Sequence, residues 1–249
     1  MIEKQVENGQ MLIIINQPEK HNAINRAMWQ QLFDCLLEAQ ARDDVKLVIL
    51  RGAGGRAFCS GGDITEYEGF FEDVTDAEDA VVGIHDVSAL LRALPIPTIA
   101  AISGHCVGAG VVIAAACDFR LCTKSSHFAV TAIKRGLPYP APAAGDLIAL
   151  VGLSMTRAIL LRGKDLSAVT AQAIGLVDEL VEDDGFDAGL ARFAAEIMSQ
   201  SNAAYSFVKK SIAHALQLVE ENKEMQALNL KALASDGFRA STRSFLGKG

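Results

Sequence analysis

Residues 103–118 read SGHCVGAGVVIAAACD, a stretch in which three glycines precede a run of small apolar residues. The apolar sequence begins upstream at residue 99, but Ser103 and His105 interrupt it. We therefore predict a core strand, a loop and a buried helix rather than a membrane span. A helix that begins near Gly108 would direct its free backbone N–H groups at whatever lies in front of it. Between Gly108 and Cys117 no side chain can move a proton, so any chemistry here belongs to the backbone.

A second glycine-rich loop, RGAGGRAFCSGGDI, occupies residues 51–64 and follows another predicted strand. Residues 52–57 fit G-x-G-x-x-A, but dinucleotide binding needs a helix that begins inside the motif, and FCSGGD interrupts it. Both loops are then either tight glycine turns or carriers of backbone N–H donors. Donors from near Gly62 and Gly108 could converge as an oxyanion hole, which stabilises a carbonyl oxygen that gains negative charge.

The rest of the chain predicts an α/β fold with a largely parallel sheet. Asn25 is a plausible cap for a helix with apolar residues at helical spacing. From about residue 186 the pattern is helical only. We expect an α/β core over residues 1–190 and a C-terminal helical region over residues 191–249, packed on the core or on another subunit. The predicted strands cover residues 10–16, 45–52, 96–104, 118–123 and, more weakly, 175–181.

Composition narrows the classes of protein that the chain can represent. Half of its 249 residues are apolar and 21% are charged, which is typical of a soluble globular protein. The net charge of -7 argues against a nucleic-acid partner. Five cysteines form no regular frame, and Cys117, Cys122 and His127 match no standard zinc spacing. We expect reduced thiols, a cytoplasmic location, no membrane partner and no metal site.

Five segments, in this order along the chain, resemble the crotonase (enoyl-CoA hydratase/isomerase) superfamily. They are QPEKHNAIN (17–25), VILRGAGGRAFCSGGDI (48–64), PTIAAISGHCVGAGVVIAAACDFRLCT (97–123), GLPY (136–139) and LLRGKDLSAVTAQAIGLVDELV (160–181). The resemblance implies a crotonase-like spiral, or superhelix, of ββα units with a C-terminal helical region that forms trimers, often paired as dimers of trimers. It implies an acyl-CoA thioester, or an acyl-carrier-protein thioester, as ligand, with coenzyme A as part of the substrate and no separate cofactor.

The resemblance also implies which residues hold that ligand. The two oxyanion-hole N–H groups fall at Gly62 and Ala109. Lys209 or Lys210 could add positive charge near the coenzyme, although a solvated helix face explains them equally well. The adenine and pantetheine would meet backbone at Ala23, Ser60, Gly62, Asp63 and Ile64, with His21 near the phosphates.

At two positions the sequence departs from the hydratases that it resembles. Their acid and base glutamates correspond to Val112 and Ala132, neither of which can donate or accept a proton. Standard water addition therefore lacks its machinery. Tyr139, in GLPY, is the leading replacement, because a methylmalonyl-CoA decarboxylase branch of the family carries a similar V-P-Y element. Decarboxylation needs no external base, since the loss of CO2 itself generates the enolate.

Other candidates and other functions stay open on the sequence alone. His85 lies in the segment where a dehalogenase branch places a functional histidine, but a surface histidine explains it as well. Asp146 could reach the acyl end only if the apolar segment before it folds inward. Besides a decarboxylase, the chain could be a non-catalytic acyl-CoA-binding protein. It could also be a hydratase or isomerase with an unrecognised acid.

Overall fold

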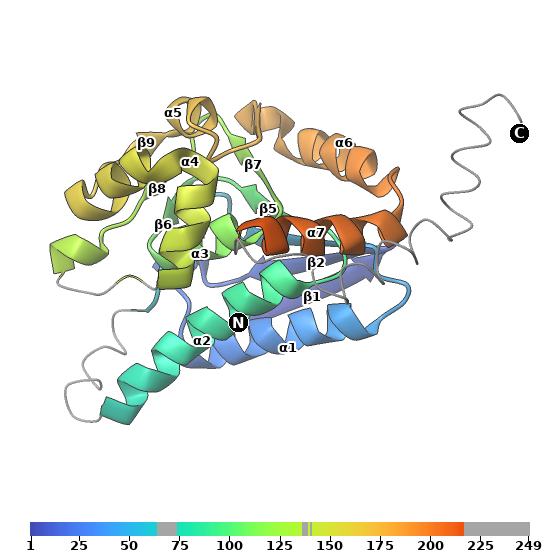
Figure 1. The fold of residues 1–249 in the computed structure, drawn as a ribbon, viewed down its shortest axis with the longest axis horizontal. Coiled ribbons are helices and arrows are strands. Elements are labelled where there is room, and N and C mark those ends of the chain that lie inside the picture. The colour runs from blue at the N-terminus through green and yellow to red at the C-terminus, as the bar shows by residue number, and fades with distance from the viewer. Residues whose placement is uncertain (64–73, 136–138, 140, 217–249) are drawn as a thin grey trace, which may run out of the picture.

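A six-stranded sheet runs through the centre of the protein, whose computed structural model describes residues 1–63, 74–135, 139 and 141–216 (Figure 1). The first two strands are antiparallel and every later neighbour in this sheet is parallel. In spatial order the strands are β1 (Ile2–Glu7), β2 (Gln10–Ile15), β3 (Leu47–Gly52), β5 (Thr98–Ile102), β7 (Phe119–Thr123) and β10 (Glu179–Val181).

A smaller, four-stranded second sheet lies beside the first, and three of its strands directly follow a strand of the large sheet in the chain. It contains β4 (Ala57–Cys59), β6 (His105–Val107), β8 (His127–Ala129) and β9 (Leu166–Ser167). Strands β3, β5 and β7 lie in the large sheet, and β4, β6 and β8 respectively follow them into the small one. A helix comes after each of these pairs, so the chain repeats a ββα unit and confirms the spiral fold predicted from the sequence.

Seven α-helices are seen in the described residues. They are α1 (Arg26–Ala41), α2 (Val74–Ala93), α3 (Ala109–Ala116), α4 (Ala141–Arg162), α5 (Ala168–Ala173), α6 (Phe186–Met198) and α7 (Asn202–Leu216). Helix α1 begins as predicted, because the Asn25 side chain accepts a hydrogen bond from the Met28 N–H at 2.9 Å. The boundary expected near residue 190 falls within α6, and the division of the chain into two parts stays a prediction.

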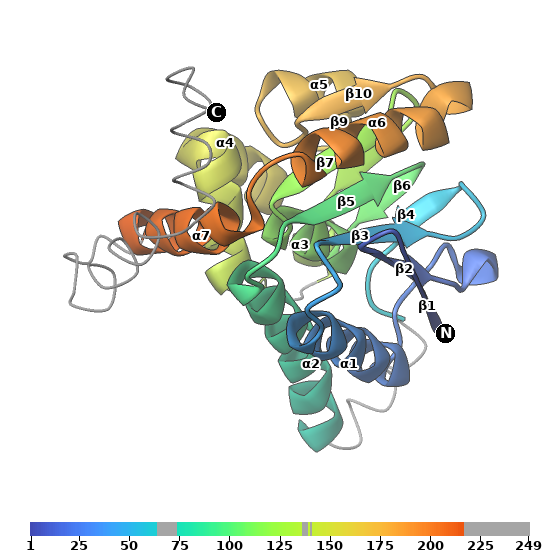
Figure 2. The ribbon, with the colours of Figure 1, turned by 90° about the vertical axis from the view of Figure 1, so that its right-hand side faces the viewer.

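The two faces of the large sheet bury different helices, because successive strand residues point to opposite sides. In β3, Val48 and Leu50 belong to a cluster that includes buried residues of α1, α2 and α3. Leu47 and Ile49 belong to a second cluster, formed with the apolar face of α6. Figure 2 shows α6 on one side of the sheet and α1 and α2 on the other. Of the helical pattern expected from about residue 186, the part that forms α6 thus packs on the core.

Helix α4 is long and apolar enough to cross a membrane by length and composition, the only such helix in the described part of the chain. Gly152 interrupts it, with φ 73° and ψ 164°, so that two shorter helices meet at a kink. Each is about ten residues, or roughly 15 Å, whereas a bilayer core is about 30 Å thick. Several of its apolar residues, including Leu153 and Leu161, are exposed in the monomer.

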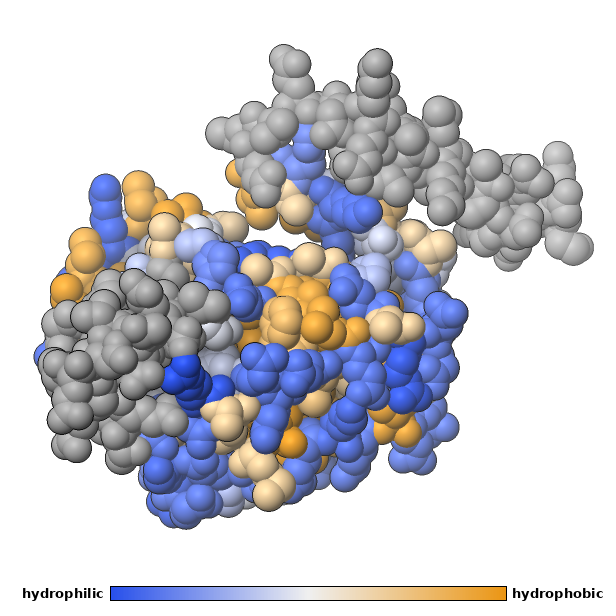
Figure 3. All heavy atoms as spheres, turned by 90° about the horizontal axis from the view of Figure 1, so that it is seen from below, coloured by the Kyte–Doolittle hydropathy of each residue, from blue (hydrophilic) through white to orange (hydrophobic). Residues whose placement is uncertain are grey.

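Exposed apolar side chains also lie along α7. Val208, Ile212 and Leu216 follow one another at four-residue spacing and are 48%, 55% and 62% exposed, so they form one stripe along the helix. Apolar atoms are likewise exposed in separate areas of the face seen from below (Figure 3). The surface of the monomer is therefore not uniformly hydrophilic.

Candidate functional site

The two glycine-rich loops of the sequence lie against each other. A Cβ atom added to Gly61 would lie 3.6 Å from the Ala109 backbone nitrogen and 3.5 Å from the Val107 carbonyl oxygen. A Cβ added to Gly108 would lie 3.7 Å from the Gly61 Cα. Gly61 has φ +115° and Gly108 has φ +56°, conformations that side chains disfavour. Glycine at both positions lets the loop after β4 and the start of α3 approach without side chains between them.

The backbone N–H of Gly62 is held in place through the carbonyl of its own peptide group. The Gly61 carbonyl accepts hydrogen bonds from the Ile24 N–H at 2.8 Å and from the Cys59 thiol at 3.7 Å. Because a trans peptide is planar, the Gly62 N–H points the opposite way, away from Ile24. It has no acceptor among the described residues. A free donor of fixed direction results.

The backbone N–H of Ala109 is fixed by the same principle. The Gly108 carbonyl accepts from the N–H groups of Val111 and Val112, at 3.0 and 3.3 Å, in the first turn of α3. The Ala109 N–H therefore points out of the N-terminal end of the helix, where the positive end of the helix dipole lies. No described residue accepts from it. Two free donors thus come from neighbouring loops, an arrangement that can stabilise negative charge on an oxygen bound between them.

The loop at residues 17–23 lies beside these donors and is clamped by Asn22, which is fully buried. Asn22 Nδ2 donates to the carbonyls of Ala53 and Ala57, at 2.9 and 2.6 Å, and its Oδ1 accepts from the Gln17 N–H. His21 is held in the left-handed region, with φ 52°. This loop is therefore fixed to the turn between β3 and β4.

Several residues expected at the coenzyme come together where this clamped loop meets the segment after β4. The Ser60 N–H donates to the His21 carbonyl at 3.1 Å, and Ile24, next to Ala23, bridges to Gly62. The nearly buried Asp63 carboxylate pairs with Lys20 at 2.6 Å. Of the expected set, Ile64 lies outside the described residues.

His21 also belongs to a row of three imidazoles. Its ring centroid lies 6.3 Å from that of His105, which stacks on His127 at 6.0 Å. Its Nδ1 atom is buried and has no hydrogen-bond partner in the described part of the protein. No group of three or more His, Cys, Asp or Glu side chains within that part could hold a metal ion.

Apolar residues stand where hydratases are expected to carry acid groups. Val112 is 2% exposed on α3, and Ala132, which opens a 3-10 helix at Ala132–Arg135, is half-buried against the same core. Tyr139 also packs there, and its buried hydroxyl has no partner among the residues described. Burial, followed by the nearby Asp146 charge, raises the pKa of Tyr139, so the phenol stays protonated and can donate a hydrogen bond.

Asp146 carries the carboxyl group whose charge acts on Tyr139. It lies on α4 and accepts a 2.7 Å hydrogen bond from Arg92 Nη1 of α2. Burial raises the pKa of Asp146, and the Arg92 charge opposes this only in part. The Asp146 side chain is thus only 16% exposed and is paired with an arginine, and its reach to the acyl end stays a prediction.

Two other candidate residues, His85 and Lys209, make their polar contacts with residues outside these loops. His85 is half-exposed on α2, 3.6 Å from Asp86, and has no hydrogen bond or ring contact with the other candidate residues in the described ranges. Lys209, on α7, donates to Asp118 at 2.8 Å and to the Ile96 carbonyl at 3.2 Å. Its ammonium group therefore ties α7 to the core.

Sequence reasoning did not single out the residues that orient the two donors. Ile24 and Cys59 hold the Gly61 carbonyl, and Asn22 fixes the neighbouring loop. Cys59 stands inside the quoted loop, in FCSGGD, two residues before the glycine that it contacts. The sequence shows that Cys59 is close to Gly61 along the chain, but only the tertiary structure shows that its sulfur contacts the Gly61 N–H and carbonyl.

Comparison with known proteins agrees with this architecture. A family model described as Enoyl-CoA hydratase/isomerase matches residues 5–249. The chain is 31% identical over 229 residues, covering 89% of itself and 77% of the relative, to the Mycobacterium leprae protein echA12, named a probable enoyl-CoA hydratase.

Two solved structures share the fold over nearly the whole chain. One is an enoyl-CoA hydratase/isomerase family protein from Hyphomonas neptunium, 34% identical with a TM-score of 0.92, covering 99% of this chain and 95% of that one. The other is an enoyl-CoA hydratase/carnithine racemase from Magnetospirillum magneticum, 30% identical with a TM-score of 0.93, covering 99% and 92%.

Proposed function

Because the chain belongs to the enoyl-CoA hydratase/isomerase family, we propose that it binds an acyl-CoA thioester and stabilises its enolate through the N–H groups of Gly62 and Ala109. The observation that carries this proposal is the pair of free, oriented donors on adjoining loops. Each belongs to a peptide whose carbonyl is already bonded, so neither must reorganise when charge develops on the thioester oxygen. The coenzyme would lie along the clamped loop, against His21, Ala23, Ser60, Asp63 and Ile64.

Decarboxylation is the reaction that this site favours. The bond between the substrate carboxylate and the α-carbon breaks, CO2 leaves, and the electron pair passes into the thioester enolate that the two donors stabilise. A proton from solvent then converts the enolate into the shorter acyl-CoA. No base is required before the bond breaks, which agrees with the apolar Val112 and Ala132. Water addition would need groups that these residues do not carry.

Tyr139 is the side chain that we assign to the acyl end of the substrate. Its hydroxyl is buried, stays protonated and lacks a partner among the described residues. A buried hydroxyl without a partner costs about 1–3 kcal/mol, a cost that a bound substrate oxygen would remove. His85 is half-exposed on α2, and it would act only if the acyl group extends that far.

Two other functions each rest on one observation. A non-catalytic acyl-CoA-binding protein would need only the backbone donors, and Val112 and Ala132 fit that function equally. A hydratase or isomerase would need an acid, and Asp146 is a carboxyl group with a raised pKa inside the fold. Its ion pair with Arg92 makes it less available for proton transfer.

We also propose that copies of the chain associate, as a trimer or a dimer of trimers. The apolar stripe of α7 and the exposed apolar residues of α4 support this, since a second copy would remove them from water. The ligand could also reach the site on an acyl-carrier protein, because the proposed chemistry takes place at the thioester. These proposals describe a cytoplasmic enzyme without a separate cofactor.

The reaction can be tested by incubating the protein with methylmalonyl-CoA and, separately, with crotonyl-CoA, and following both by mass spectrometry. We expect CO2 loss from the first substrate and no hydration of the second. Tyr139→Phe should lower the decarboxylation rate at least about tenfold, or about 1.4 kcal/mol in the barrier. Tyr205→Phe, on α7, is the matched control and should leave the rate unchanged.

Hydration of crotonyl-CoA at an ordinary enzyme rate, about 1–1000 per second, would overturn the proposed reaction. Tight binding of acyl-CoA without turnover would instead support the non-catalytic function.

A further inference from the structure

We propose that Cys59 is a positioning residue, whose thiol holds the Gly61–Gly62 peptide in the orientation that presents the Gly62 N–H to a thioester carbonyl. The inference rests on the proposed function, because it concerns how one of the two oxyanion donors is fixed. The thiol is assigned no contact with substrate.

The contacts of the sulfur carry the inference. Cys59 Sγ accepts a hydrogen bond from the Gly61 N–H at 3.4 Å and donates to the Gly61 carbonyl at 3.7 Å. One side chain therefore engages the polar groups on both sides of a residue with φ +115°. The same carbonyl accepts from the Ile24 N–H. Since the peptide is planar, fixing this carbonyl fixes the direction of the Gly62 N–H.

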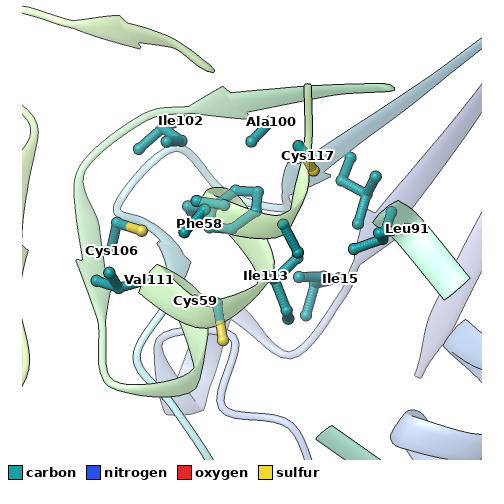
Figure 4. Close-up of a cluster of buried hydrophobic side chains, with 14 of the residues drawn as sticks. Ile15, Phe58, Cys59, Leu91, Ala100, Ile102, Cys106, Val111, Ile113 and Cys117 are labelled. Atoms are coloured by element: carbon teal, nitrogen blue, oxygen red, sulfur yellow. The ribbon is translucent and has the colours of Figure 1, made fainter. Parts of the chain in front are cut away.

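Cys59 also lies against the helix that presents the second donor. A Cβ on Gly110, in the first turn of α3, would lie 2.4 Å from the Cys59 carbonyl oxygen and 3.1 Å from its Cβ. Backbone at Cys59 therefore packs directly on the helix that presents the Ala109 N–H. Figure 4 shows Cys59 beside α3 with its sulfur directed away from Phe58 and the centre of the core. The residue thus contacts the Gly61 peptide through its sulfur and the first turn of α3 through its backbone.

The protonation state of the thiol suits this task. Cys59 is fully buried, and burial raises its pKa to about 12. The thiol is therefore protonated at neutral pH, so it can donate to a carbonyl while its lone pair accepts from an N–H. Serine can make both bonds as well, whereas alanine and valine can make neither.

The test compares two ligands that differ only at the carbonyl. One is a short acyl-CoA thioester, and the other is the S-alkyl-CoA thioether with the same carbon chain but no carbonyl. We expect the wild-type protein to prefer the thioester. In Cys59→Ala that preference should fall about tenfold, while the affinity for the thioether changes less than about twofold.

The control variants separate positioning from general damage. Cys59→Ser should retain the preference within about threefold, because the hydroxyl restores both bonds. Cys106→Ala removes an equally buried thiol from the strand position paired with Cys59, and should keep the preference. Cys59→Val, which fills the space without a donor or acceptor, should behave like Cys59→Ala and serves if the alanine variant does not fold.

A spectroscopic measurement gives an independent outcome. The carbonyl stretch of bound, isotope-labelled thioester should lie at a lower frequency than in water, and should move back toward the free value in Cys59→Ala and Cys59→Val. If these variants keep both the wild-type preference and the wild-type frequency, Cys59 is not a positioning residue. If the wild-type protein itself shows no preference for the thioester, the proposed function fails instead.

Discussion

Two glycines of residues 103–118 are required because there is no room for a side chain at their positions. A Cβ on Gly104 would lie 2.1 Å from the Arg56 carbonyl oxygen, and one on Gly110 would lie 2.4 Å from that of Cys59. Both positions exclude a side chain because backbone lies against them. Gly108 allows the turn into α3. The quoted stretch therefore brings backbone close to backbone, and the free N–H groups follow from that.

A pH-dependent effect is expected at Asp146, whose pKa burial raises above the ordinary 3.8 despite Arg92. A raised carboxyl pKa stabilises the folded state fully below pH 3.8, and this stabilisation is lost as pH rises through the folded-state value. The unfolding free energy of wild type minus that of Asp146→Asn should therefore fall with rising pH, by at most about 1.4 kcal/mol per unit. Urea unfolding from pH 3.5 to about 7 measures it.

Asp183→Asn provides a control of opposite sign. The Ser125 hydroxyl donates to Asp183 and lowers the pKa of this carboxyl group. Its contribution should be present at neutral pH and lost as pH falls. Equal slopes for the two variants would contradict the environment described for Asp146.

Among the helices, the contacts that attach each one to the core differ. Helix α3 is enclosed on nearly every side, and seven of its eight residues are buried. Helix α6 buries one face on the large sheet. Helix α7 has no fully buried residue among those described. Instead, the Lys209 ammonium group on α7 donates to the Asp118 carboxylate and to the carbonyl oxygens of Leu91 and Ile96. Polar contacts of Lys209 therefore attach α7 to the core, whereas buried apolar side chains attach α6.

Lys209→Met should consequently destabilise the fold. Its side chain is 10% exposed, and its loss leaves the Asp118 carboxylate without its cation. We expect the free energy of unfolding to fall by about 2 kcal/mol. Lys210→Met, the same change on the exposed neighbouring residue, should alter it by less than about 0.5 kcal/mol. Urea unfolding at one fixed protein concentration makes the comparison, and equal effects would show that the Lys209 contacts are not stabilising.

At the scale of the whole molecule, the monomer leaves apolar surface uncovered on α4 and α7. Glutamate placed in the α7 stripe, as Ile212→Glu, should prevent association if this stripe lies between copies, because a buried charge without a partner is costly. Light scattering should then give a mass near the 26.5 kDa monomer for the variant and a multiple of it for wild type.

Leu37→Glu, the same kind of change at an apolar residue that is 42% exposed on α1, is the control and should leave the assembly intact. A wild-type protein of monomer mass, or an Ile212→Glu variant that keeps the full assembly, would contradict the proposed association.

The short apolar runs of the sequence and its helix-capping asparagine predicted their elements well. The strands expected at residues 10–16, 45–52, 96–104 and 118–123 correspond to β2, β3, β5 and β7, and Asn25 caps α1. The strand expected at residues 175–181 is reduced to β10, since Gly175 forms a turn with φ +84°. Strands β4, β6, β8 and β9 have only two or three residues each, which is too short for an alternating pattern to be recognised.

Residue types and their order along the chain were therefore enough to identify the family, the alternation of the longer strands with helices, and the places where glycine lets backbone approach backbone, whereas the ββα order followed only from the family resemblance. These properties depend on residue type and spacing along the chain. Tertiary structure alone decided which donors are free, that the Cys59 thiol holds the Gly61 peptide, and that Lys209 engages Asp118. Those outcomes depend on contacts between groups that only the folded chain brings together. They also depend on the direction of each N–H group, which the planar peptide fixes.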